Sequence, residues 1–117
     1  MQIDPAFLID LKAFDEDFYV KVCKGLLKPV LDVIRICAKA CHVELTNLII
    51  PTLNDSEDSV RKMVDWIYDN LGSEVPLHLS RYFPCYNMDL PPTPIETLER
   101  AARIAKEKLK FVYLGNL

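Results

Sequence analysis

The fold prediction rests on residues 43–50, which read Val-Glu-Leu-Thr-Asn-Leu-Ile-Ile. The first four residues alternate between apolar and polar side chains. An alternation of period two is typical of a β-strand, because successive side chains along a strand point to opposite faces. We therefore expect a strand in which Val43 and Leu45 face a core, while Glu44 and Thr46 point the other way.

Similar short apolar runs recur on both sides of this strand. They begin at residues 7, 43, 77 and 111, so that neighbouring runs are 34 to 36 residues apart. A segment with helical periodicity separates each run from the next. Alternating strands and helices are typical of βα units, whose strands pair in parallel. Right-handed connections between the strands would place all four in one sheet or one arc of a barrel, with the helices outside. The predicted fold class is therefore α/β.

Three helices are expected in the connections. They are predicted at residues 29–40, 54–71 and 93–109, and Gly72 follows the second. An additional short helix is expected at 15–23, and a Pro-rich irregular connection at 81–92.

Composition narrows the class of protein. The chain has 117 residues, of which 50% are hydrophobic and 26% are charged, so it is predicted to be one globular domain. Its net charge of −3, with both signs mixed along the chain, argues against binding to nucleic acid or to an anionic membrane. No apolar stretch has the length of a membrane span, and the expected location is the cytoplasm.

The four cysteines are expected to be reduced thiols, which is the usual state in the cytosol. Cys37 and Cys41 stand four residues apart and would share one face of a helix. Because they lack a second pair of ligands at a recognised spacing, we favour core thiols over metal ligands. No metal site is predicted.

Polar pairs at spacing two accompany each of the first three strands. The pairs are Asp10 and Lys12, Glu44 and Thr46, and His78 and Ser80. Strands of ordinary parallel sheets are apolar on both faces, so a polar face in three strands favours a lumen that holds a polar ligand. The alternatives are a solvated face of an antiparallel sheet, or a charge network of Lys12 with Asp10 and Glu44.

Ligands of α/β folds lie beyond the carboxyl ends of the strands. The residues expected there are Lys12, Asn47, the turn at 51–54, Ser80, Arg81, Gly115 and Asn116. Lys12 and Arg81 are suited to anchor a carboxylate or phosphate, and Asp10 to bind ribose hydroxyls. His78 is predicted to be a hydrogen-bonded residue of the lumen, and no residue is assigned as catalytic.

Several motifs follow one another along the chain. The first part carries Asp10-Leu11-Lys12-Ala13-Phe14, Cys23-x-Gly25 and Pro29-Val30-Leu31. The remainder carries Val43-Glu44-Leu45-Thr46, Ile49-Ile50-Pro51-x-x-Asn54-Asp55-Ser56, His78-x-Ser80-Arg81-Tyr82-Phe83-Pro84, Pro91-Pro92-Thr93-Pro94 and Val112-Tyr113-x-Gly115-Asn116. In order and spacing they resemble radical S-adenosylmethionine enzymes related to pyruvate formate-lyase activating enzyme. The later motifs resemble the AmmeMemoRadiSam-system subgroup of those enzymes.

The resemblance implies a partial (β/α)6, TIM-like barrel, of which residues 1–117 would be the part from the fourth strand onwards. Members of the family cleave S-adenosylmethionine at a 4Fe–4S cluster to give a 5′-deoxyadenosyl radical. By resemblance, Asp10 and Lys12 would contact S-adenosylmethionine. The residues implied to line the lumen are Glu44, Thr46, His78, Ser80 and Arg81.

The C-x3-C-x2-C loop that holds the cluster in the family is absent from this sequence. Cys37-x3-Cys41 matches its first half, but Glu44 stands where the third cysteine would be needed. The chain is therefore predicted to be the carboxyl-terminal part of a radical S-adenosylmethionine enzyme, without the amino-terminal half that binds the cluster. Alone, it should assemble no cluster and be inactive.

An isolated arc has two open edges and a face without cover, which predicts association. The expected partners are the missing amino-terminal barrel half or further copies of the chain, and a protein substrate for the complete enzyme. Two alternatives stay open. One is a non-catalytic binding or interaction module derived from a barrel, and the other is a barrel fragment that binds an anionic metabolite.

Overall fold

The computed structural model describes residues 6–11, 27–51, 53–83 and 91–115. Strands and helices alternate along this part of the chain. Their order is β1 (Ala6–Asp10), α2 (Leu27–Ala40), β2 (His42–Ile49), α3 (Glu57–Leu71), β3 (Leu77–Arg81), α4 (Ile95–Lys106) and β4 (Val112–Gly115). The short helix predicted at 15–23 lies outside the described residues.

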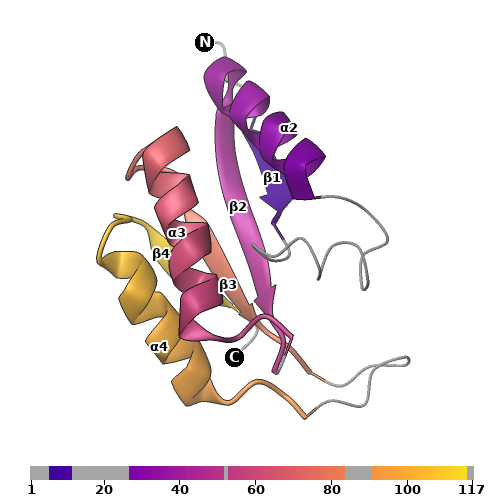
Figure 1. The fold of residues 1–117 in the computed structure, drawn as a ribbon, viewed down its shortest axis with the longest axis vertical. Coiled ribbons are helices and arrows are strands. Elements are labelled where there is room, and N and C mark those ends of the chain that lie inside the picture. The colour runs from indigo at the N-terminus through magenta and orange to yellow at the C-terminus, as the bar shows by residue number, and fades with distance from the viewer. Residues whose placement is uncertain (1–5, 12–26, 52, 84–90, 116–117) are drawn as a thin grey trace.

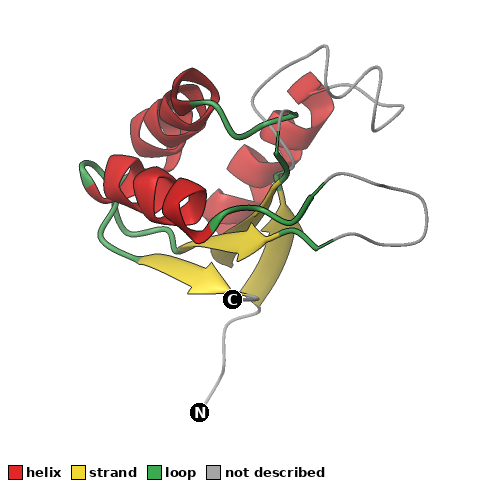
Figure 2. Cartoon of the chain, turned by 90° about the horizontal axis from the view of Figure 1, so that it is seen from below, coloured by secondary structure: helices red, strands yellow, loops and turns green. Residues whose placement is uncertain are grey.

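All four strands belong to one sheet and pair in parallel in the order β1-β2-β3-β4 (Figure 1). The helices α2, α3 and α4 lie together on one side of this sheet (Figure 2). The other face carries no helix from the described part of the chain. The α/β prediction of parallel βα units forming an open arc, with the helices outside, is therefore confirmed.

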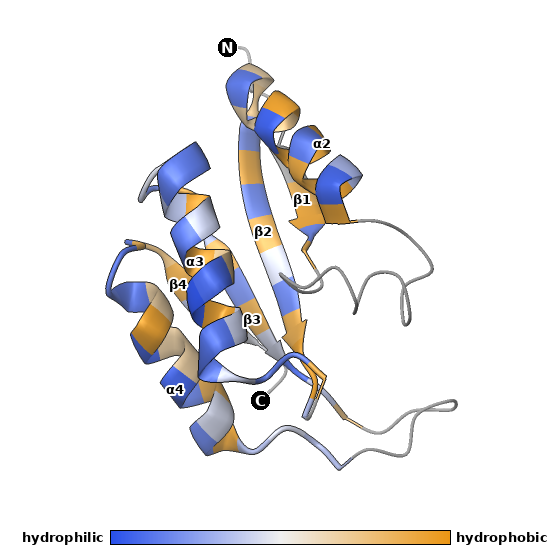
Figure 3. Ribbon diagram, viewed as in Figure 1, coloured by the Kyte–Doolittle hydropathy of each residue, from blue (hydrophilic) through white to orange (hydrophobic). Residues whose placement is uncertain are grey.

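The register of the strands explains why one face is buried. Leu45 of β2 lies beside Ile9 of β1 and Leu77 of β3. These side chains face the helices, and Leu45 and Leu77 are completely buried. The hydropathy colouring of Figure 3 shows the same alternation as bands along β2. Each strand thus contributes every second residue to the core.

The start and end of α3 follow the sequence signals. Ser56 caps the helix by accepting a hydrogen bond from the Ser59 amide at 3.1 Å. Gly72 ends it with a φ of +94°, a conformation that glycine adopts without steric cost. These caps fix where the chain turns back toward β3.

The start of α4 differs from the prediction of a helix beginning at residue 93. The buried Thr93 hydroxyl donates to the Ile49 carbonyl at 2.5 Å and accepts from the Tyr82 amide at 3.0 Å. Because Thr93 joins the ends of β2 and β3 in this way, it does not cap the helix, which begins at Ile95. Leu109 lies beyond the end of α4 at Lys106, yet it is buried in the core.

Leu45 and Leu8 offer a matched test of the two faces. Leu45→Ala would leave a cavity in the core and should lower the free energy of unfolding by about 2–5 kcal/mol. Leu8 is 68% exposed on the face without helices, so Leu8→Ala should change it by less than about 0.5 kcal/mol at concentrations low enough to keep the chain monomeric. Urea unfolding followed by Trp66 fluorescence measures both. Equal losses would contradict the assignment of the faces.

Candidate functional site

The face of the sheet without helices, which we call the open face, carries the predicted polar residues. One row across the strands consists of Asp10, Thr46, His78 and Tyr113, which are neighbours in register. Asp10 is exposed, whereas Thr46 and His78 are half-buried. The strands thus bring residues from four distant parts of the sequence into one line.

The Glu44 carboxylate lies between two histidines on this face. One oxygen is 2.6 Å from Nε2 of His78, and the other is 3.1 Å from Nε2 of His42. The side chains of His78 and Glu44 are 33% and 35% exposed. Glu44 and His78 are residues predicted from the sequence, whereas His42 is not, although its position two residues before Glu44 places both on the same face.

These two histidines hold the pKa of Glu44 below its usual range. The hydrogen bond from His78 is the largest cause and that from His42 the second, while partial burial of the carboxylate opposes them. Glu44 is therefore held as a carboxylate that accepts hydrogen bonds from both rings.

Asp10 and Thr46 make a weaker contact. The Thr46 hydroxyl donates to the Asp10 carboxylate at 3.5 Å. Lys12, the predicted partner of Asp10 in the motif, lies outside the described residues, as does Asn116. The roles of Asp10 and Lys12 toward a cofactor stay predictions.

Ser80 follows His78 on the open face, at the end of β3. Its register partners are Leu48 of β2 and Gly115 of β4. The Ser80 hydroxyl lies 3.6 Å from the position that a Cβ at residue 115 would occupy.

Arg81, at the end of β3, makes contacts with neighbouring residues. Its Nε donates to the Thr93 carbonyl at 2.7 Å, and its guanidinium lies 4.7 Å from the centre of the Phe83 ring. The bond to Thr93 links the segments on both sides of residues 84–90. The role of Arg81 in the lumen stays a prediction.

Asn47 and Asn54 lie near and after the carboxyl end of β2, where their side chains bind backbone groups. Asn47 is only 2% exposed on the helix-facing side of the sheet, and its amide donates to the Leu11 carbonyl at 2.6 Å. Asn54 accepts from the Ile50 amide at 2.6 Å and donates to the Leu48 carbonyl at 2.8 Å. Both side chains satisfy buried backbone groups at the strand ends, which is a structural role.

The open face also carries apolar and aromatic side chains that are not among the predicted lumen residues. Leu8, Leu48 and Tyr113 are exposed there. The Tyr113 ring stacks on His78, with ring centres 5.2 Å apart and planes inclined by 30°. The sequence does carry a signal for Tyr113, because it stands two residues before Gly115 and residues at that spacing share one face of a strand.

Cys37 lies on α2 and Cys41 directly follows that helix, and both are half-buried against the core. The Cys41 thiol donates to the Cys37 carbonyl at 3.1 Å, and partial burial, with Cys37 nearby, raises the pKa of Cys41. Among the described residues, no group of three or more His, Cys, Asp or Glu side chains is arranged to hold a metal ion. Cys23 and Cys85 lie outside that part of the chain.

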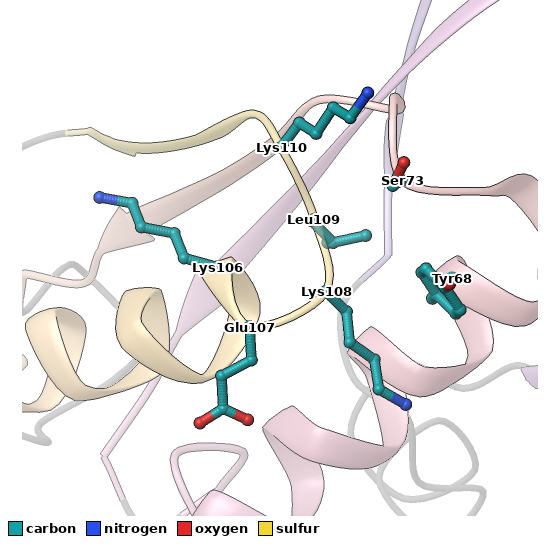
Figure 4. A pocket seen from close by; sticks show the side chains of 7 residues that line it. All are labelled: Tyr68, Ser73, Lys106, Glu107, Lys108, Leu109 and Lys110. Atoms are coloured by element: carbon teal, nitrogen blue, oxygen red, sulfur yellow. The ribbon is translucent and has the colours of Figure 1, made fainter.

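A hollow of 760 Å³ lies beside the turn between α4 and β4 (Figure 4). Three lysines border it, but Lys108 pairs with Asp65 at 2.7 Å and Lys110 with Glu74 at 3.3 Å. These pairs tie the turn to neighbouring elements and offset two of the three lysine charges that would attract an anion. The hollow is therefore a weaker candidate than the open face.

Comparisons with known proteins support the fold. A crystal structure of a domain of pyruvate-formate lyase-activating enzyme from Bacteroides vulgatus superposes with a TM-score of 0.81, covering 95% of this chain and 67% of that one. At 20% sequence identity, this likeness concerns the fold alone. None of the helices in the described residues has the length and apolar character that a membrane crossing requires.

A relative in sequence is the uncharacterized protein MJ0808 of Methanocaldococcus jannaschii, which is 49% identical over 115 residues. The match covers 96% of this chain and 34% of MJ0808, so the chain spans about a third of that relative's length. No family model matches the chain.

The histidine contacts of Glu44 predict a pH dependence. Because the pKa of Glu44 is lowered in the fold, its stabilising effect is complete above the ordinary value of about 4.5 and is lost as the pH falls through the lowered value. Wild type should therefore melt at a higher temperature than Glu44→Gln at pH 6, and the difference should shrink toward pH 3.

Thermal melts of both proteins between pH 3 and pH 6 provide the measurement. Glu99→Gln, at an exposed position of α4, is the matched control and should follow the wild type throughout. A Glu44→Gln difference that stays constant over this range would contradict the assignment.

Proposed function

We propose that this chain is the carboxyl-terminal portion of a radical S-adenosylmethionine enzyme related to pyruvate formate-lyase activating enzyme. In the complete enzyme it would supply part of the S-adenosylmethionine and substrate site. The observation that carries this proposal is the open arc of four parallel strands with one polar face, whose fold resembles a domain of such an activating enzyme. The sequence motifs give the same assignment independently.

Two groups of residues would serve the site. Asp10 and Lys12 would bind S-adenosylmethionine, with the exposed Asp10 carboxylate accepting hydrogen bonds from ribose hydroxyls. The residues proposed to face the substrate are Glu44, Thr46, His78, Ser80 and Arg81. When bound at a 4Fe–4S cluster, S-adenosylmethionine supplies a 5′-deoxyadenosyl radical to this class of enzyme.

The cluster itself does not fit the described residues. Such a cluster needs three converging thiolates. The described residues offer two half-buried cysteines, Cys37 of α2 and Cys41 just after it, and the second is hydrogen-bonded to the backbone of the first. We therefore assign the cluster to a separate amino-terminal barrel half, and no step at the cluster to this chain. The great length of MJ0808 beyond the matched region agrees with such an arrangement.

Reconstitution tests the proposal. Anaerobic incubation of the 117-residue chain with iron and sulfide should give neither a stoichiometric cluster nor 5′-deoxyadenosine. Addition of the corresponding amino-terminal half of a full-length relative should restore both, because the cluster ligands would then be present. Ultraviolet–visible spectra and product chromatography measure the two results. Activity of the chain alone, or failure with the added half, would contradict the proposal.

Asp10 provides a sharper test within the restored complex. Asp10→Asn should weaken S-adenosylmethionine binding by about tenfold or more, since it removes a charged hydrogen-bond acceptor. Asp69→Asn, at an exposed position of α3, is the control and should leave the affinity unchanged. Equal affinity of the two variants would remove Asp10 from the site.

The exposed apolar residues of the open face predict association of the isolated chain. Leu8, Leu48 and Tyr113 would be covered in a complete barrel or an oligomer, as would the outer edges of β1 and β4, which pair with no further strand among the described residues. Light scattering should therefore show species larger than 13.4 kDa, and Leu8→Ser should shift the distribution toward the monomer. A clean monomer that binds no hydrophobic dye would contradict this prediction.

A further inference from the structure

The geometry around Glu44 defines the hydrogen positions on both neighbouring imidazoles. The carboxylate is an acceptor and has one oxygen for each ring, with Nε2 of His78 at 2.6 Å and Nε2 of His42 at 3.1 Å. A carboxylate in this position requires a hydrogen on each Nε2. In the neutral rings, Nδ1 then carries a lone pair and no hydrogen.

Within the described residues, Nδ1 of His78 has no hydrogen-bond partner. The other contact of this ring is with Tyr113, whose ring lies over it and limits its rotation. The ring is therefore held from two sides, by Glu44 at Nε2 and by Tyr113 at its face. A fixed ring with one unused lone pair is a preorganised acceptor.

We infer that Nδ1 of His78 is a hydrogen-bond acceptor for a ligand on the open face, and that Glu44 is the positioning residue that keeps it so. The group it would accept from is a hydroxyl or a protonated amine. Ser80, which follows on the same strand and face, adds a hydroxyl nearer the strand's carboxyl end. This inference deepens the proposed function and rests on it, because it treats the open face as the substrate side.

Charge on the open face agrees with a hydrogen-bond donor as the ligand group. Asp10 stands in the same row as His78, and the Glu44 carboxylate contacts the His78 ring, so a carboxylate ligand would meet repulsion there. If the bound group transfers its proton to Nδ1, its O–H or N–H bond breaks and a new N–H bond forms. The resulting imidazolium is then balanced by Glu44, and no electrons are exchanged.

Nuclear magnetic resonance of the ¹⁵N-labelled histidine rings tests the positioning. In the wild-type chain, His78 should carry its hydrogen on Nε2, with a downfield proton that exchanges slowly with water. Glu44→Ala should lose this protection at His78, since no acceptor then remains beside its Nε2. Asp10→Asn, which removes a carboxylate from the same row, is the matched control and should leave the His78 signals in place.

The hydrogen position on the His78 ring of the wild-type chain tests the inference even if the variant folds poorly. A hydrogen on Nδ1 of His78, or unchanged protection of His78 in Glu44→Ala, would overturn the inference. The ligand side is tested by titration with methylammonium and with ethylene glycol. At least one should shift Nδ1 of His78, whereas tetramethylammonium, which has no hydrogen to donate, should not. No shift with either donor would overturn the ligand class.

These readouts need neither a cluster nor S-adenosylmethionine. If reconstitution fails but the histidine signals are as expected, only the proposed function is contradicted. If activity is restored but His78 carries its hydrogen on Nδ1, only the assignment of Glu44 and His78 is contradicted.

Discussion

The alternation of side chains along β2 is the constraint on which the rest of the molecule depends. This strand is paired on both sides, with β1 and with β3. A shift of its register by one residue would turn Leu45 to the open face and Glu44 into the core beneath the helices, at the cost of burying an unpaired charge. The same period that builds the core therefore also presents Glu44, Thr46 and the neighbouring strands' polar residues together.

The open face carries both a polar group and exposed apolar side chains. Glu44 and the two histidines form a hydrogen-bonded group near the middle of the sheet, while Leu8, Leu48 and Tyr113 are exposed around it. A polar group within an apolar surround is typical of ligand sites, where a few polar atoms fix the orientation of a molecule held mainly by burial. In this chain that surround is open to solvent.

Much of the fold and part of the site could be predicted from the sequence. The period of apolar runs and the helix caps at Ser56 and Gly72 are local signals, so the strands and α3 came out correctly. Asn47 and Thr93 could not be interpreted in the same way, because their partners, Leu11 and Ile49, are 36 and 44 residues distant. A polar residue at a strand end has the same appearance in sequence whether it faces a ligand or satisfies the backbone. His42 was missed because its role depends on a shared carboxylate, which is visible only in three dimensions.

The strand order has a consequence for how the chain is made. Each strand pairs with the strand immediately before it in the sequence, and no later segment is inserted between two earlier ones among the described strands. A chain leaving the ribosome can therefore add one βα unit at a time to an existing edge, without waiting for its carboxyl terminus. Such stepwise growth keeps loop closure short and favours rapid folding over topologies that join distant segments. The strands are synthesised in the same order in which they lie side by side in the sheet.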